Sequence, residues 1–517
     1  MVLFRSLATV GGLTMVSRVL GFVRDILIAL VLGAGPVADA FFVAFRFPNL
    51  FRRLFAEGAF NSAFVPLFAR RLEEDGREAA RRFAEQALAV LLTALLALTV
   101  LAQIAMPWLM MLIAPGFAEE PAKFDLAVQL TQITFPYLLF MSLIALQSGV
   151  LNSLHRFGHA AAAPILLNIV MILALAVVAP LTGMPGHVLA WAVAVAGICQ
   201  FLWLVAACHR AGMALHLPMP RLTPPVRRLL RLMGPGVLGA GVMQINLLVG
   251  TIIATLQPGA VSYLYYADRI YQLPLGVIGA AVGVVLLPEL TRSLRANRPA
   301  AAMDSMNRCL EFALLLTLPA AAALIAIPGP IISVLFERGA FDAAAAEATT
   351  LALAAFATGL PAYVLVKALA PAFFAREDTA TPFRFGAISV VANVVLSLLL
   401  FQVFAFVGIA LATAIASWIN VGLLAWRLHR SGFLKTDARL RERLPRTLVC
   451  SLVMGGALWV AAELLEPALA GPLPLAAAAL AVLVFGGMGL FGGLALACGA
   501  LKADEFRQLL RRRQRTA

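Results

Sequence analysis

Charged side chains interrupt several segments that are otherwise long and apolar enough to cross a membrane. The ionisable residues in these segments are Arg18, Arg24, Asp25, Asp39, Arg46, Arg52, Arg53, Glu57, Asp268, Arg269 and Lys367. An arginine at the centre of a bilayer costs about 2.5–3.5 kcal/mol on insertion scales. Such residues persist where they face a water-filled cavity, a partner or a ligand, and we interpret them as functional.

The chemistry that these residues favour is the binding of an anion. Arginine outnumbers acid among the well-buried groups, and its planar guanidinium binds phosphate through two parallel hydrogen bonds. The predicted substrate-binding set is Arg18, Arg24, Arg52 and Arg269. The predicted supporting or gating set is Ser17, Asp25, Asp39, Asn49, Arg53, Glu57, Asp268 and Lys367. Two alternatives stay open: the acids only neutralise neighbouring arginines, and Arg46 and Arg53 are ion-paired or reach the membrane interface.

The spacing in the apolar segment 38–64 places most of its polar residues on one helical face. At 3.6 residues per turn, five side chains fall within about 60° of a common direction. They are Asp39, Arg46, Asn49, Arg53 and Glu57. Arg52 lies about 100° away in an unbroken helix, and Pro48 is expected to kink this helix.

The composition of the chain excludes a soluble protein. Of its 517 residues, 62% are hydrophobic and 13% are charged, whereas soluble domains are nearer half apolar and a quarter charged. Fourteen apolar segments reach the length of about 20 residues that a helix needs to cross the hydrocarbon core. They are 7–32, 38–64, 84–112, 127–153, 160–180, 186–208, 229–256, 260–288, 309–336, 348–374, 384–403, 405–427, 446–465 and 474–499. Because these runs are continuous, the predicted fold is an all-α polytopic membrane protein with 14 transmembrane helices.

The loops between these segments alternate in charge. Basic residues gather after the even-numbered segments and in the C-terminal tail, and they give most of the net charge of +14. By the positive-inside rule, both termini are predicted to lie in the cytoplasm. This explains the positive charge without nucleic acid as a partner. The first segment runs past Leu32 and carries charges, so we expect a retained span rather than a signal peptide.

Motifs for enzymatic chemistry do not occur in the sequence. It has no Walker loop, no HExxH and no dinucleotide fingerprint. The five cysteines form no CxxC pair and no ligand set with the six histidines. We therefore predict that the chain is not an enzyme and holds no cofactor or metal. Any transport must draw on an ion gradient, a membrane potential or a partner.

The chain repeats itself weakly, with the second half following the first at a nearly constant offset. Corresponding residues include Pro136 with Pro361 and Asn168 with Asn393. Each block holds six spans, an even number, so both blocks insert the same way round, and a central cationic cavity lies between two pseudo-symmetric lobes. The predicted organisation is an N-terminal lobe over 1–215, a C-terminal lobe over 216–430, and two further helices with a basic cytoplasmic tail over 431–517.

Five stretches resemble a known family. They are Ser17-Arg-Val-Leu-Gly-Phe-Val-Arg-Asp25, Ala38-Asp-Ala-Phe-Phe-Val-Ala-Phe-Arg-Phe-Pro-Asn49, Phe55-Ala-Glu-Gly-Ala-Phe60, Tyr265-Tyr-Ala-Asp-Arg269 and Lys367-Ala-Leu-Ala-Pro371. These motifs are similar to those of the MurJ (MviN) lipid II flippases, and the resemblance covers essentially the whole chain. It implies the multidrug/oligosaccharidyl-lipid/polysaccharide exporter fold, with two extra C-terminal helices that line a groove for the lipid tail.

The resemblance also implies an activity, which is the transfer of lipid II from the inner to the outer leaflet of the bacterial cytoplasmic membrane by alternating access, for peptidoglycan synthesis. The family's functional arginines fall on Arg18, Arg24, Arg52 and Arg269. Gln272 stands where some relatives have an acid, which puts a gating role there in doubt. The partners expected are lipid II, membrane lipids and cell-wall synthesis proteins, with the chain itself a monomer.

Three rival functions stay open at this stage. A flippase for another lipid-linked oligosaccharide would also need a cationic cavity. A cation-coupled drug exporter would need acids in excess, and this sequence has the opposite balance. A scaffold for cell-wall enzymes would have no use for intramembrane arginines.

Overall fold

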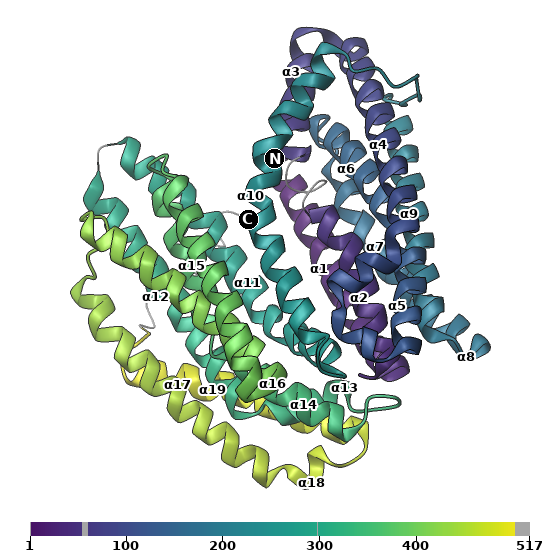
Figure 1. Cartoon of the computed structure of the whole chain (residues 1–517). Helices are drawn as coiled ribbons and strands as arrows, with labels where there is room; N and C mark the ends of the chain where they lie inside the picture. The colour runs from purple at the N-terminus through teal and green to yellow at the C-terminus, as the bar shows by residue number, and fades with distance from the viewer. Residues whose placement is uncertain (1, 54–59, 297, 502–517) are drawn as a thin grey trace. The chain divides into compact units, whose positions relative to one another are not determined.

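Every regular element among the described residues is a helix, in agreement with the predicted all-α class. The computed structural model describes residues 2–53, 60–296 and 298–501 (Figure 1). Contacts divide the chain into two compact units. The first comprises Met1–Ser262 and Arg338–Phe341, and the second comprises Tyr263–Glu337 and Asp342–Ala517.

The first unit is a bundle of helices from the N-terminal half. In chain order they are α1 (Val2–Leu32), α2 (Pro36–Phe51), α3 (Asn61–Glu74), α4 (Gly76–Ile113), the 3-10 helix η2 (Pro115–Glu119), α5 (Pro121–Thr134), α6 (Tyr137–Ser153), α7 (Phe157–Leu173), the π-helix η3 (Ala174–Val178), α8 (Ala179–Thr182), α9 (Pro185–Arg210) and α10 (Pro224–Ala254). Helix α1 packs on α7, α2 packs on α5, and α9 contacts both α6 and α7 (Figure 1). Helix α10 packs on α3 and α4.

The second unit contains the remaining helices. They are α11 (Ala260–Arg295), which begins in the first unit, α12 (Pro299–Ala326), α13 (Pro328–Phe336), α14 (Ala343–Ala357), α15 (Leu360–Phe374), α16 (Ala380–Arg430), α17 (Ala438–Leu464), α18 (Glu466–Leu469) and α19 (Leu473–Ala497). Helix α12 packs on α15 and α17, and α17 packs on α19. Helix α16 holds two predicted spans, which meet at Ala405, a residue with φ of 51°.

The helix breaks recur between the two halves of the chain. Helices α5 and α6 are separated at Phe135 and Pro136, and α14 and α15 are separated just before Pro361. Proline has no N–H group to donate to the preceding turn, so the helical hydrogen-bond ladder is interrupted near both prolines. The sequence repeat is therefore visible in the pattern of elements.

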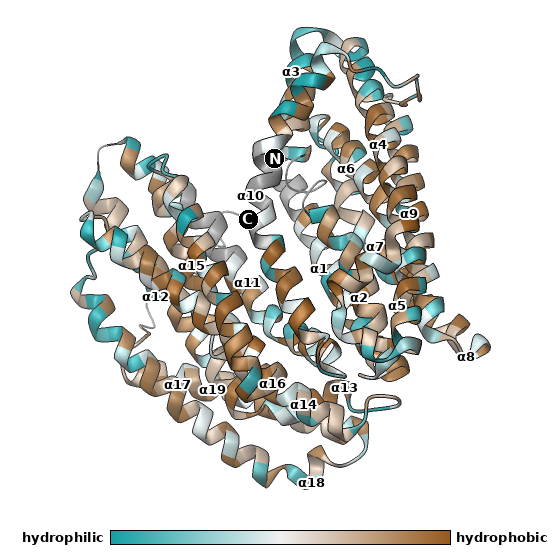
Figure 2. Cartoon of the chain, in the orientation of Figure 1, coloured by the Kyte–Doolittle hydropathy of each residue, from teal (hydrophilic) through white to brown (hydrophobic). Residues whose placement is uncertain are grey.

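The helices expose large apolar side chains, whose contact with water would be unfavourable. Trp108 and Ile104 on α4 are 68% and 67% exposed, and hydrophobic residues cover the middle turns of α4 and α9 (Figure 2). Among the described residues, nine helical segments are long and apolar enough to cross a membrane. The count of fourteen spans stays a prediction. The division into two lobes, 1–215 and 216–430, and a C-terminal part, 431–517, also stays a prediction, because it follows the sequence repeat rather than the contacts.

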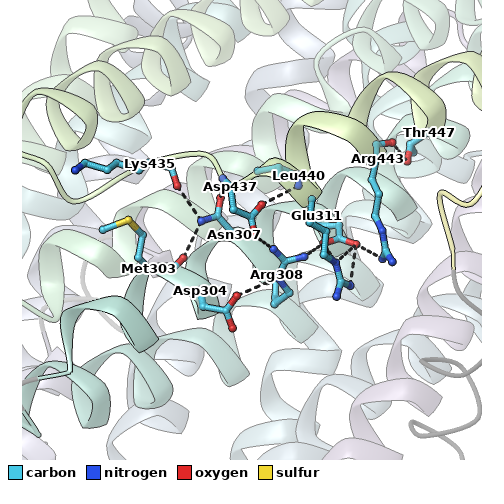
Figure 3. Close-up of polar contacts among 11 residues, drawn as sticks. Met303, Asp304, Asn307, Arg308, Glu311, Lys435, Asp437, Leu440, Arg443 and Thr447 are labelled. Carbon is cyan, nitrogen blue, oxygen red and sulfur yellow. Dashed lines mark hydrogen bonds and ion pairs between the residues drawn. The ribbon is translucent and has the colours of Figure 1, made fainter.

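A cluster of ion pairs in the second unit fixes the start of α17 against α12 (Figure 3). Glu311 on α12 accepts hydrogen bonds from Arg439 at 3.0 Å and Arg443 at 2.5 Å on α17. It also accepts from Arg308, one turn earlier on α12. The side chains of Glu311 and Arg443 are only 11% and 5% exposed. The carboxylate thus holds two helices that are distant in sequence.

The same cluster caps the N-terminus of α17. Asp437 accepts a hydrogen bond from the backbone N–H of Leu440 at 2.7 Å and pairs with Arg308. Asn307 Nδ2 donates to the carbonyl of Lys435 at 2.9 Å. Arginines and carboxylates are balanced here, since Asp304 also pairs with Arg308. This balance indicates a structural clamp on α17 rather than a binding site for an anion.

Replacing Glu311 by glutamine should lower the free energy of unfolding by about 3–5 kcal/mol, because it removes the charge that balances a nearly buried Arg443. Thermal unfolding of the detergent-purified protein measures the loss. The matched control is Glu442→Gln, which removes the 62% exposed partner of Arg446 and should cost less than about 1 kcal/mol. Equal losses in the two variants would show that the Glu311 cluster does not stabilise the fold.

Candidate functional site

Helix α1 carries a buried arginine whose guanidinium is oriented by two neighbours. Arg24 donates from Nη2 and Nε to Asp25 Oδ1 at 2.7 and 3.0 Å, and from Nη1 to Asn168 Oδ1 at 2.9 Å. Asn168 on α7 in turn donates from Nδ2 to the carbonyl of Ser17 at 2.9 Å. Arg24, Asp25 and Asn168 are all buried. The predicted residues Ser17, Arg24 and Asp25 therefore belong to one network that connects α1 to α7.

Arg18 lies in a different environment on the same helix. Its side chain is exposed in the first unit. An exposed guanidinium on a predicted membrane span is available to a ligand, and the cost of placing it in hydrocarbon requires a polar environment there.

Two polar residues of α2, Arg46 and Asp39, contact α10 and the start of α11. Arg46 donates from Nη1 to Thr251 Oγ1 on α10 at 2.8 Å. Further along, Asn49 Oδ1 accepts from Arg52 Nε at 3.0 Å, and Asn49 Nδ2 donates to the carbonyl of Phe45 at 2.7 Å. Arg53 is exposed. The predicted residue Glu57 lies outside the described residues.

Asp39 is a fully bonded carboxylate of the first unit and has no exposed surface. Its Oδ1 accepts from the backbone N–H of Ser262 at 3.0 Å and from Ser262 Oγ at 2.6 Å. Its Oδ2 accepts from the backbone N–H of Gly259 at 2.8 Å and from Lys123 Nζ at 3.0 Å. Gly259 and Ser262 flank the first residues of α11, so Asp39 caps the N-terminus of that helix.

Lys123 is a member of this cluster that the sequence analysis did not identify. It lies between the predicted spans 84–112 and 127–153, yet it is 4% exposed, and its Nζ lies 4.4 Å from the centre of the Phe117 ring. Phe117 belongs to η2, directly before α5. The available signal was a lysine beside apolar residues at the end of a span, and that pattern is common at membrane interfaces. The burial comes from the tertiary fold and from pairing with Asp39.

In the second unit, α11 presents the Tyr265–Arg269 motif. The Arg269 guanidinium carbon lies 4.5 Å from the centre of the Tyr265 ring, a cation–π contact. Asp268 accepts a hydrogen bond from Gln272, the residue for which the sequence analysis left a gating role in doubt. Lys367 on α15 reaches over Gly279, where an added Cβ would lie 2.7 Å from Lys367 Nζ. Arg269 and Lys367 thus belong to the second unit, and the other predicted cations to the first.

The described members of this set can bind and orient an anion. Asp25 and Asn168 orient the guanidinium of Arg24, Asn49 bonds to that of Arg52, and the Tyr265 ring contacts that of Arg269. No group of three or more His, Cys, Asp or Glu side chains that could hold a metal ion occurs within residues 2–53, 60–296 and 298–501. A guanidinium that is oriented in this way can form charge-assisted hydrogen bonds with an anion such as a phosphate.

Comparisons with known proteins agree on one family. The family model described as Lipid II flippase MurJ matches residues 28–474. A Rhizobium tropici protein named Probable lipid II flippase MurJ is 48% identical over 522 residues, which covers 99% of this chain and 98% of its own length. A Burkholderia cenocepacia protein named Lipid II flippase MurJ is 36% identical over 459 residues and covers 88% and 89% of the two chains.

Solved structures show the fold. Lipid II flippase MurJ in an inward closed conformation gives a TM-score of 0.78 at 24% identity and covers 97% of this chain and 99% of its own. An inward-facing multidrug resistance MATE family transporter of the MOP superfamily gives a TM-score of 0.68 at 15% identity, with coverage of 83% and 99%.

Substitutions at the Asp39 cluster should rank by how many donors they leave without an acceptor. Asp39→Ala should lower the free energy of unfolding by about 3–5 kcal/mol, because it leaves the N-terminus of α11 without its cap and the buried ammonium of Lys123 with only the Glu120 carboxylate, at 3.8 Å. Lys123→Met should cost less, about 1–3 kcal/mol, since Asp39 keeps its three donors at Gly259 and Ser262. Thermal unfolding in detergent measures both.

The double variant Asp39→Ala/Lys123→Met supplies the control for this ranking. Its loss should be smaller than the sum of the two single losses, because the two side chains interact directly. Additive losses would contradict the buried ion pair.

Proposed function

Because the chain belongs to the MurJ family of lipid II flippases, we propose that it moves lipid II from the inner to the outer leaflet of the bacterial cytoplasmic membrane, and that its intramembrane arginines bind the diphosphate of the head group. The observation that carries the proposal is the 48% identity, over 99% of the chain, to a protein named as such a flippase. The buried, oriented Arg24 supports the part of the proposal that concerns the arginines.

The arrangement around Arg24 explains why a guanidinium is needed there. Asp25 and Asn168 bond to different nitrogens of the group and fix its plane. An arginine held in this way loses little conformational freedom when it binds a diphosphate, which reduces the entropic cost of recognition. Arg18, Arg52 and Arg269 are proposed to contribute further charge-assisted hydrogen bonds to the same head group. Each such bond is worth roughly 1.5–3 kcal/mol.

We propose that transport proceeds by alternating access, with the undecaprenyl tail remaining in lipid or in a groove beside α17 and α19. The residues Ser17, Asp25, Asp39, Asn49, Arg53, Glu57, Asp268 and Lys367 then support or gate the site. Asp39 is well placed for gating, because the helix cap that it provides to α11 is a compact polar contact that can be made and broken as a unit. The substrate is anionic, so an inside-negative potential favours its export by about 2.3 kcal/mol per charge per 100 mV if the charge crosses the full field.

The same proposal covers the setting of the protein. It is a multi-pass protein of the inner membrane that acts as a monomeric transporter, with both termini in the cytoplasm and cell-wall synthesis proteins as further partners. A flippase for a different lipid-linked oligosaccharide is the rival that the cationic residues also allow. The identity of the family favours lipid II.

The test uses cells in which this protein can be depleted and lipid II on the outer face can be labelled. Wild-type protein should restore labelling, and Arg24→Ala should fail to restore it at limiting substrate. The loss of one or two charge-assisted bonds should weaken binding about 10- to 150-fold per bond. Arg24→Lys should be intermediate, because it keeps the charge but not the planar donors.

The control for this test is Arg82→Ala, which removes an equal charge from a side chain that is 75% exposed. It should restore labelling like wild type. If Arg24→Ala also does so at matched protein levels, the flippase activity stands and the role of Arg24 is refuted. If depletion leaves labelling unchanged in cells with no second flippase, the lipid II assignment itself is wrong.

A further inference from the structure

A short loop from the C-terminal half is seated on the end of α1 in the first unit. The loop is Arg338–Phe341, and both of its ends continue into the second unit. The backbone N–H of Ala340 donates to the carbonyl of Leu30 at 2.9 Å. A Cβ added at Gly339 would lie 2.3 Å from that same carbonyl oxygen, and a Cβ added at Gly33 would lie 2.1 Å from the carbonyl oxygen of Ala340. Backbone therefore meets backbone, with no room for a side chain at either glycine.

A second loop makes the same kind of contact with the end of α10. Gly116 lies in η2, and a Cβ added there would be 2.1 Å from the carbonyl oxygen of Thr255 and 2.7 Å from Cα of Leu256. Real Cβ atoms essentially never approach closer than 3.0 Å. Thr255 directly follows the last residue of α10. This contact, like the first, joins a loop glycine to a carbonyl at the end of a long helix.

The two contacts are related by the repeat of the chain. Gly116 and Gly339 are 223 residues apart, and so are Asp39 and Ser262. Leu30 and Thr255 are separated by the same number of residues as Pro136 and Pro361, which mark the matching helix breaks of the two halves. The loop of each repeat is thus seated on the end of the first long helix of the other repeat. A glycine at both loop positions is what this close approach requires.

Gly116 and Gly339 follow the third and ninth predicted spans, 84–112 and 309–336, and the positive-inside rule predicts the outer side for loops after odd-numbered spans. We propose that these glycines are positioning residues for the closed state of the outer side, each admitting a carbonyl that any side chain would push away. The loop Arg338–Phe341 must leave α1 if the two halves of the chain separate on this side. A contact made through backbone atoms and held by the hydrogen bond from Ala340 suits a closure that forms and breaks in every cycle. Asp39 lies next to the second contact, since it binds Gly259 and Ser262 a few residues beyond Thr255.

This inference rests on the proposed alternating access, but its test does not need lipid II. The reporter is Ala260→Cys, at a fully buried position, in a chain whose five natural cysteines are replaced. Spheroplasts are treated with a membrane-impermeant maleimide, and the rate of labelling is measured. Gly116→Ala and Gly339→Ala should each raise this rate several-fold, since the closed outer side becomes less populated. Each should also reduce lipid II labelling in depleted cells.

Two control variants separate the contact from the general effect of replacing glycine. Gly35→Ala matches Gly116→Ala, because an added Cβ at Gly35 meets nothing within 4 Å. Gly183→Ala matches Gly339→Ala, because Gly183 also has a left-handed φ, of 66°, but faces open space. Both controls should label slowly, like the parent.

The proposal is overturned if Gly116→Ala and Gly339→Ala label no faster than their controls. It is also overturned if neither variant reaches the membrane, because the glycines then serve folding rather than closure. If the two glycine variants react faster with maleimide but depletion of the protein leaves lipid II on the outer face unchanged, the closure is supported and the assignment of lipid II as substrate is refuted.

Discussion

The cost of charge in an apolar environment governs the structure of this protein. A carboxylate or guanidinium that leaves water must recover its hydration from partners, and the effective penalty is several kcal/mol per ion where partners are missing. Two carboxylates of the described chain with little or no exposed surface meet this requirement fully. Asp39 accepts four hydrogen bonds, and Glu311 accepts from three arginines. Each satisfied carboxylate fixes at least two helices, so the positions of the helices follow from the positions of the charges.

Two classes of charged residue are distinguished by this requirement. The clamp at Glu311 is electrically balanced, and its arginines and carboxylates bond to one another. Arg24 differs, because two groups orient its guanidinium together. One is the neighbouring carboxylate of Asp25, and the other is the amide of Asn168 on another helix. A cation whose plane is fixed in advance on a rigid helix is what the proposed role of Arg24 in ligand binding requires. The same comparison explains why counting charges in the sequence could not separate the two classes.

The sequence predicted the all-helical class, the two related halves and the positions of most helices, because these depend on hydropathy and on the proline breaks at Pro136 and Pro361. It also singled out Arg24, Asp25 and Asp39, since a charge inside an apolar run is visible without a structure. It did not reveal Lys123, whose burial depends on contact with a residue 84 positions earlier. Nor did it reveal the cap on α11, because a side chain on one helix that caps another leaves no local pattern in the sequence.

The divergence between the two repeats has a physical reason at the Asp39 cap. Asp39 and Ser262 lie 223 residues apart and so occupy related positions in the two repeats, and they bond directly to each other at 2.6 Å. Two carboxylates at these related positions could not both stay ionised, because like charges at that distance repel. Two serines would avoid repulsion but would leave the buried Lys123 with only the more distant Glu120 carboxylate, at 3.8 Å, as a counter-charge. One acid opposite one hydroxyl satisfies both demands, since the acid accepts from the serine, from two backbone N–H groups and from the lysine. A symmetric pair would therefore cap α11 less well than the asymmetric pair does, and the contact itself favours repeats that have diverged.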